Sequence, residues 1–116
     1  MKFRATLFIG ILAISSAAGA DYPHNMSAGV LRADCELLDR ASQVRCEAFL
    51  MGVVDTVAAL TFSKKLDHSF YCIPERVTEI QLRQAFVEYV ATENVKISDP
   101  GVDVALAAFG RAFPCK

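Results

Sequence analysis

The stretch FYCIPERVTEIQ, residues 70–81, decides the fold together with the chain's last four residues, FPCK, 113–116. Cys72 precedes an apparent helix and Cys115 follows another, and each lies near a proline. Two such thiols are candidates for metal ligands, for a catalytic nucleophile, or for the two halves of a disulfide. The rest of the sequence has to decide between these three roles.

The segment after residue 77 carries the clearest helix start in the chain. Thr78 followed by Gln81 is a capping box, in which the threonine hydroxyl accepts from the Gln81 amide and Gln81 reaches back to the Thr78 amide. Val77 and Leu82 occupy the two positions of a hydrophobic staple. The apolar stripe of this helix, which ends near residue 92, consists of Leu82, Phe86, Tyr89 and Val90.

Three further segments have the 3–4 spacing of apolar residues that indicates a helix. One begins at Ser27, a candidate N-cap, and ends at Arg40. The second spans 42–62, and the third starts with Asp99 as N-cap and Pro100 at the first helical position, and is stopped by Pro114. The apolar face of the second helix consists of Cys46, Phe49, Leu50, Val53, Val57, Leu60 and Thr61. No segment indicates a strand, so the sequence predicts an all-α fold, a small four-helix up-down bundle.

Two residues of the second helix call for an explanation. Gly52 lies in mid-helix, where glycine costs about 1 kcal/mol relative to alanine, and we expect the close approach of a neighbouring helix there. Asp55 lies among valines, and we expect it to make a structural hydrogen bond at the edge of the core.

The first twenty residues, 1–20, are typical of a signal peptide. Lys2 and Arg4 precede an uncharged, mostly apolar stretch, and Ala18-Gly19-Ala20 offers small residues for cleavage. The expected mature domain is 21–116, periplasmic and not attached to the membrane after cleavage. It carries ten basic and thirteen acidic residues. This balance excludes the basic stripe of a nucleic-acid binder.

The four cysteines, Cys35, Cys46, Cys72 and Cys115, indicate a disulfide framework in a short exported chain. Structural zinc sites pair their ligands two to five residues apart, and the cysteine spacings here of 11, 26 and 43 contain no such pair. We therefore expect no metal site and no cofactor.

An enzyme is also not expected. A catalytic cysteine would need a histidine beside it, and His24 and His68 lie in polar, non-helical stretches. No nucleophile elbow, phosphate loop or nucleotide fingerprint is present, so no catalytic residue can be assigned.

The bundle topology selects one pairing of the four cysteines. In an up-down bundle only Cys35–Cys46 with Cys72–Cys115 joins partners at the same pole. The other two pairings join opposite ends, whereas a disulfide tolerates about 7 Å between Cα atoms. Cys72 and Cys115 are therefore expected to form a clasp.

The longest polar connection, SKKLDHSFY at residues 63–71, is a candidate partner-binding surface, with Lys64, Lys65, Asp67 and His68 as candidate contacts. A solvated connection without function is the alternative.

At this point the chain resembles a known family. Cys35 and Cys46, then FLMGVVD (49–55), CIP-x₂-VT-x₂-Q (72–81) and a terminal FPC (113–115) are similar to the Rap/Tai family of type VI secretion immunity proteins. The similarity covers nearly all of the expected mature domain, and it departs from the family pattern at Glu93-Asn94.

The resemblance implies an exported, helical, disulfide-bonded inhibitor of a peptidoglycan amidase toxin delivered by neighbouring cells. Members of the family can be dimeric, so it also implies a homodimer as one state. The alternative is a general periplasmic helical stress protein, a holdase, or a structural module without a toxin partner.

Overall fold

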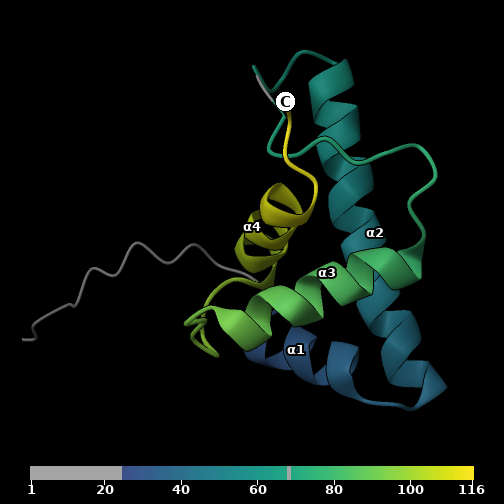
Figure 1. Ribbon diagram of the computed structural model, residues 1–116, viewed down its shortest axis with the longest axis vertical. Helices are drawn as coiled ribbons and strands as arrows, with labels where there is room; N and C mark the ends of the chain where they lie inside the picture. The colour runs from purple at the N-terminus through teal and green to yellow at the C-terminus, as the bar shows by residue number, and fades with distance from the viewer. Residues whose placement is uncertain (1–24, 68) are drawn as a thin grey trace, which may run out of the picture.

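The computed structural model describes residues 25–67 and 69–116, so the expected signal peptide, His24 and His68 lie outside the described residues. This part of the chain has four helices and no strand. The helices are α1 (Ala28–Glu36), α2 (Arg40–Phe62), α3 (Glu79–Thr92) and α4 (Gly101–Ala112). The predicted all-α fold with four helices is confirmed. α1 and α3 both lie across the lower part of α2, and α4 packs beside α3 (Figure 1).

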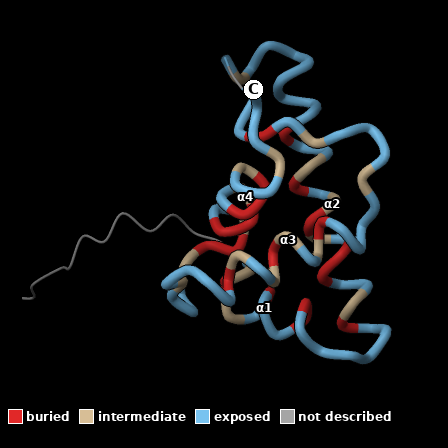
Figure 2. The backbone as a smooth tube through the Cα atoms, in the orientation of Figure 1, coloured by how far each residue is buried: buried red, intermediate tan, exposed pale blue. Residues whose placement is uncertain are grey.

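The core lies where the four helices meet. Each helix contributes to it, and the largest fully buried side chains are Leu31, Cys46, Leu50, Leu82, Phe86 and Phe109. Figure 2 shows that the buried positions face the centre of the molecule, while the upper turns of α2 and the connection after them are exposed. The core therefore encloses α2 as far as Val57 and leaves its last residues outside.

Two predicted helix starts are confirmed. The Ser27 hydroxyl accepts from the Val30 amide at 3.3 Å at the start of α1. Before α3, the Thr78 hydroxyl accepts from the Gln81 amide at 3.3 Å, and Gln81 Oε1 accepts from the Thr78 amide at 2.9 Å. The full capping box is therefore formed.

The predicted boundary between the first two helices is wrong. α1 ends at Glu36 and not at Arg40, which is already the first residue of α2. The reason is Asp39, whose carboxylate accepts from the Ser42 amide at 2.9 Å and so caps α2. The backbone of Leu37 and of Asp39 is extended, and the chain turns there from α1, which lies across the lower end of α2, into α2 (Figure 1).

The predicted start of α4 is also wrong by one residue. Pro100 is the N-cap and has no capping side chain, and Gly101 is the first helical residue. Asp99 is not the cap because its carboxylate accepts from the Lys96 amide at 2.9 Å, which closes the turn before the helix. The Gly101 amide instead donates to the Met26 carbonyl at 2.8 Å, so another part of the chain satisfies this helix end.

Two further backbone hydrogen bonds near this contact connect the start of α1 to the segment between α3 and α4. The Ala28 amide donates to the Asp99 carbonyl at 2.7 Å, and the Gly29 amide donates to the Ile97 carbonyl at 3.0 Å. A Cβ on Gly29 would lie 3.0 Å from the Ile97 Cβ, so this close approach favours glycine.

Both predicted disulfides are present. Cys35–Cys46 joins α1 to α2 with 5.0 Å between the Cα atoms, and Cys72–Cys115 joins the segment before α3 to the chain end with 4.9 Å. In the chain-entropy account the loops of 11 and 43 residues correspond to about 3 and about 4 kcal/mol of stability. Cross-links of this size matter in a domain with so small a core.

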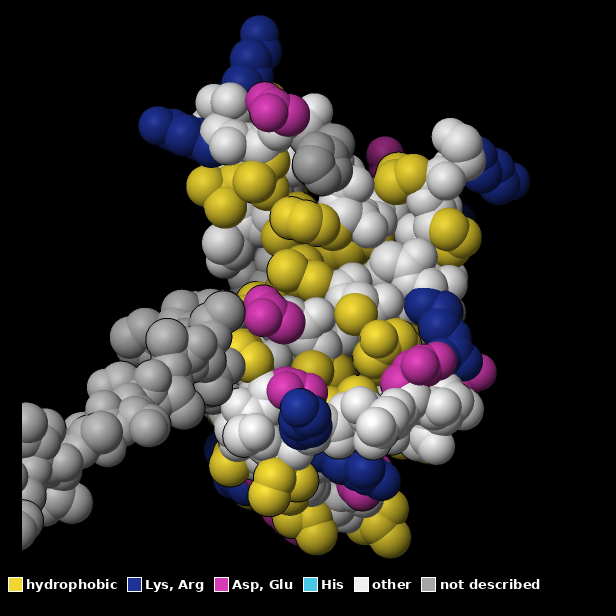
Figure 3. Space-filling view, turned by 90° about the vertical axis from the view of Figure 1, so that its left-hand side faces the viewer, with side chains coloured by type: hydrophobic (Ala, Val, Ile, Leu, Met, Phe, Trp, Pro, Cys, Tyr) yellow, Lys and Arg dark blue, Asp and Glu magenta, His cyan; other side chains and the backbone are white. Residues whose placement is uncertain are grey.

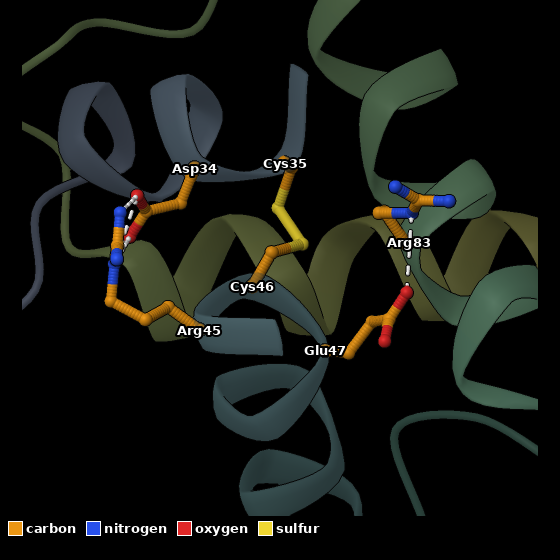
Figure 4. The surroundings of a disulfide bond; sticks show 6 residues. All are labelled: Asp34, Cys35, Arg45, Cys46, Glu47 and Arg83. Atoms are coloured by element: carbon orange, nitrogen blue, oxygen red, sulfur yellow. Dashed lines mark hydrogen bonds and ion pairs between the residues drawn. A yellow bond between two sulfur atoms is a disulfide. The ribbon is translucent and has the colours of Figure 1, made fainter. Parts of the chain in front are cut away.

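Two ion pairs flank the first disulfide (Figure 4). On one side, Arg45 Nη2 lies 2.7 Å from Asp34 Oδ1, and its hydrogen bonds with Asp34 raise the pKa of Arg45. On the other, Arg83 Nε of α3 lies 3.6 Å from Glu47 Oε1 of α2. Glu47 is 9% exposed, and this oxygen has no hydrogen-bond partner among the described residues. The other Glu47 oxygen, Oε2, lies 3.8 Å from Nη1 of the exposed Arg40, so two arginine charges compensate this carboxylate.

We predict that Thr78→Ala lowers the free energy of unfolding by about 1 kcal/mol, because α3 loses its cap. Urea denaturation measures the change. Thr56→Ala is the matched control, since Thr56 is an exposed mid-helix threonine whose hydroxyl donates only to the Gly52 carbonyl of its own helix. Equal midpoints for the Thr78 variant and the parent would contradict this account of the start of α3.

A second prediction concerns the buried carboxylate. Arg83→Ala should destabilise the fold by about 2 kcal/mol, because the nearly buried Glu47 carboxylate loses its closer arginine and retains only the exposed Arg40, 3.8 Å away. Adding Glu47→Gln to this variant should recover most of the loss, since a neutral amide then replaces the poorly compensated carboxylate. A double-mutant cycle by chemical denaturation measures the coupling, and additive effects would show that the two side chains do not interact.

Candidate functional site

α2 extends well beyond the helices that pack against it. It has 23 residues, whereas α1, α3 and α4 have 9, 14 and 12. Every residue from 58 to 65 is exposed, and we call this segment the α2 tip. Phe62 is 91% exposed at its end, and Leu60 is 37% exposed. The prediction that Leu60 and Thr61 belong to the buried face is wrong, because no helix lies opposite them.

The α2 tip ends in a complete Schellman motif. The Lys65 amide donates to the Leu60 carbonyl at 2.8 Å, and the Lys64 amide donates to the Thr61 carbonyl at 3.1 Å. Lys64 adopts the left-handed conformation with a φ of 56°, at the position where glycine is usual. In this conformation the lysine Cβ is close to the following carbonyl oxygen, a steric cost that glycine avoids. The lysine side chain also places positive charge at the negative end of the helix dipole.

An open apolar groove of about 720 Å³ runs beside the α2 tip, and we call it the α2 groove. One wall is the outer face of α2, and the other is the non-helical segment 69–77, with Leu82 of α3 also contributing. Its residues from α2 are Met51, Val54, Val57, Ala58, Thr61 and Phe62, and those from the segment are Ser69, Tyr71, Cys72, Ile73, Pro74, Glu75 and Val77. A concave, mainly apolar surface of this kind suits a binding site.

The wall segment is held against the end of α4. The Cys72 amide donates to the Phe113 carbonyl at 2.8 Å, next to the Cys72–Cys115 bond. The Tyr71 ring meets the Phe109 ring edge-on, with 5.5 Å between the centroids. A Cβ on Gly110 would lie 3.2 Å from the Phe70 carbonyl oxygen, so the segment also runs close to the backbone of α4. These contacts fix a segment that has no regular secondary structure.

Tyr71 is the one buried hydroxyl at this site. Its side chain is 5% exposed, and its Oη has no hydrogen-bond partner in the described part of the chain. Burial raises the pKa of Tyr71 to about 12, and the negative charge of Asp55 acts in the same direction. Asp55 itself is exposed on α2, so its interaction with the core edge is electrostatic and not the structural hydrogen bond expected from the sequence.

The predicted partner contacts lie next to this groove. Phe62 and Ser69 both line the groove, and the connection between them carries Lys64, Lys65 and Asp67, which are all exposed. His68, the fourth candidate, lies outside the described residues. Figure 3 shows Lys, Arg and acidic side chains at the upper end of the molecule, directly above a hydrophobic region. The arrangement combines an apolar groove with charged side chains at its end.

Sequence reasoning missed the apolar part of this site. The sequence predicts Phe62 as the last residue of the second helix and assigns it no function. It predicts Phe70, which is 45% exposed, as part of a polar connection. The available signal was a phenylalanine in the last turn of α2 directly before Ser-Lys-Lys. A last turn with an aromatic residue and polar neighbours indicates a helix end that leaves the core.

The explanation expected for Gly52 is wrong. A Cβ at Gly52 would meet no atom within 4 Å, so no neighbouring helix approaches there. Gly52 instead lines a second, shallower apolar hollow of about 390 Å³, with Phe49, Val53 and Val102 around it. We have no physical account of why this position is glycine.

Residues 25–67 and 69–116 contain no group of three or more His, Cys, Asp or Glu side chains that could hold a metal ion. Within the same ranges, every helix is too short or too polar to cross a membrane.

A family model described as Rap1a immunity proteins matches residues 27–115, which is most of the chain and all four helices. The search of curated proteins and the search of solved structures find no match.

A third prediction concerns Tyr71. Because its folded pKa of about 12 exceeds the ordinary value of 10, its contribution to stability is complete below pH 10 and is lost as the pH rises toward 12. Tyr71→Phe should remove this alkaline loss and change the stability at pH 7 by less than about 1 kcal/mol, since the hydroxyl is unpaired.

Thermal unfolding of parent and variant between neutral pH and pH 12 measures the difference, with Tyr89→Phe as the control. A parent and a Tyr71 variant that lose stability equally above pH 10 would contradict the assignment.

Proposed function

The chain belongs to the Rap1a immunity protein family, and from this membership we propose that it binds and inhibits a type VI secretion toxin that is a peptidoglycan amidase. The inhibitor is not itself an enzyme and uses no cofactor. It acts by occupying the toxin surface through which the cell-wall substrate enters.

At the level of residues, this proposal rests on the exposed α2 tip beside the α2 groove. An aromatic side chain that is 91% exposed is costly to leave in water, and such residues are frequent energetic centres of protein interfaces. The α2 tip projects from the body, so it can enter a concave surface, while the groove can receive apolar side chains from the partner. The family supplies the class of partner.

The charged side chains at the end of α2 have a different role. Lys64, Lys65 and Asp67 are exposed, and charges at the rim of an interface affect mainly association rate and choice of partner. Phe62 and the groove then supply most of the affinity. We include His68 among the contacts because it belongs to the same connection.

The expected location is the periplasm, after removal of the signal peptide. The two disulfides support an oxidising compartment, and free cysteines are absent from the described residues. A homodimer, which the family resemblance implies as one state, is part of the proposal. Sedimentation of the purified domain, alone and with toxin, determines the number of copies in each state.

The test uses the mature domain, residues 21–116, and amidase toxins encoded beside its gene or in related strains. We expect inhibition of peptidoglycan cleavage at near one-to-one stoichiometry. Phe62→Ala should raise the Kd about 30-fold, which corresponds to about 2 kcal/mol for an interface centre. Asp67→Ala and His68→Ala should have smaller effects, and Lys65→Ala should mainly slow association at low salt.

Leu38→Ala is the matched control, because Leu38 is 90% exposed and lies in the connection between α1 and α2 at the other end of the molecule. If both the Phe62 and the Leu38 variants inhibit as well as the parent, the contact surface lies elsewhere. If the parent inhibits no such amidase, the immunity role is wrong, and the helical stress-protein alternative is then tested by suppression of aggregation.

A further inference from the structure

The two disulfides of this chain differ sharply in accessibility. Cys35 and Cys46 are 4% and 0% exposed and lie within the core between α1 and α2. Cys72 and Cys115 are both exposed. Reduction of a disulfide requires a thiolate to reach one of its sulfur atoms, so access controls the rate. A reductant can reach the second bridge in the folded protein and the first only after local unfolding.

The exposed bridge is also part of the candidate binding site. Cys72 lines the α2 groove, and its disulfide is the only covalent attachment of the wall segment 69–77 to the chain end. Further contacts at this point include the hydrogen bond from the Cys72 amide to the Phe113 carbonyl, the edge-on contact of Tyr71 with Phe109, and the close approach of the Phe70 carbonyl to Gly110. Phe113 itself lies beyond the last residue of α4.

We propose that the Cys72–Cys115 bridge is a reduction-sensitive switch that holds the wall of the α2 groove in place, so that the chain binds its toxin when this bridge is oxidised and releases it when the bridge is reduced. The inference rests on the proposed function for its final step, and its structural part stands independently of the toxin.

The chemistry needs a dithiol reductant. One of its thiolates attacks one sulfur of the bridge, which forms a mixed disulfide and releases the other cysteine as a thiolate that takes up a proton. The second thiolate of the reductant then displaces the remaining cysteine, which is also protonated. Two electrons and two protons pass to the protein, and the reductant leaves as its own disulfide.

Reduction should loosen one side of the site only. Without the covalent bond, the 43-residue loop between the two cysteines is no longer closed, and the last residues can separate from the wall segment. The opposite wall belongs to α2, whose lower turns stay fixed by the core and by the buried bridge. The groove would therefore lose its shape while the four helices persist.

This difference gives the switch a direction. Cytosolic thiols are kept reduced, whereas the cysteine thiols of exported proteins are oxidised to disulfides. A chain that forms its groove wall only on oxidation would not bind toxin before export, and it would bind after export.

The test begins with the purified oxidised domain and a titration with dithiothreitol. Trapping of free thiols by alkylation, followed by mass spectrometry, should find Cys72 and Cys115 modified at lower reductant concentrations than Cys35 and Cys46. At a concentration where only the first pair is modified, hydrogen exchange should accelerate in residues 69–77 and 111–116, with no change in α1 and the lower turns of α2. Inhibition of the amidase should weaken by about tenfold or more and return on reoxidation.

Cys72→Ser/Cys115→Ser should reproduce the reduced state without reductant, and circular dichroism checks that its helices are retained. If that variant does not fold, the partly reduced parent carries the same test. Simultaneous opening of the two bridges, or unchanged exchange in residues 69–77 after selective opening, would overturn the proposal.

Normal inhibition by the selectively reduced protein would overturn it as well. An oxidised parent that inhibits no amidase would instead contradict the proposed function, and the alkylation and exchange results would still decide the structural part.

Discussion

The mismatch in length between α2 and its neighbours is the constraint on which the site depends. A helix of 23 residues extends about 35 Å, and the helices that cross it cover only its lower turns. The upper turns keep their backbone hydrogen bonds but have no helix to pack against. The non-helical segment 69–77 covers one side of them, and this leaves a groove on that side and an exposed end at Phe62.

This arrangement explains the positions of the two disulfides. The Cys35–Cys46 bridge lies among the helices, where packing, the Asp34–Arg45 pair and the Glu47–Arg83 pair also act. The Cys72–Cys115 bridge lies where packing is sparse. A segment without helix or strand has few backbone hydrogen bonds of its own, so its position depends on a small number of contacts. The covalent bond is the strongest of them.

The sequence predicted the parts of the fold that local chemistry determines. The capping box at Thr78, the cap at Ser27 and the cysteine pairing follow from short-range patterns and from topology, and all are confirmed. The role of Asp99 is predicted wrongly because a carboxylate can cap a turn as well as a helix, and only the tertiary contact of Gly101 with Met26 decides between the two.

Leu60 and Phe62 continue the apolar periodicity of α2, and periodicity does not reveal where the neighbouring helices stop. The candidate contacts at Lys64, Lys65 and Asp67 were accessible to sequence reasoning as a polar connection, whereas the groove beside them depends on residues brought together by the clasp.

The proposed binding surface is one region of the molecule, the α2 tip with the wall segment, and hydrogen exchange of the oxidised domain in complex with an amidase toxin tests this most directly. We expect the complex to protect the α2 tip, residues 58–65, and the wall segment, 69–77, relative to the free protein, with no change in the connection between α1 and α2. Protection confined to that connection, or to the outer faces of α1 and α3, would contradict the account.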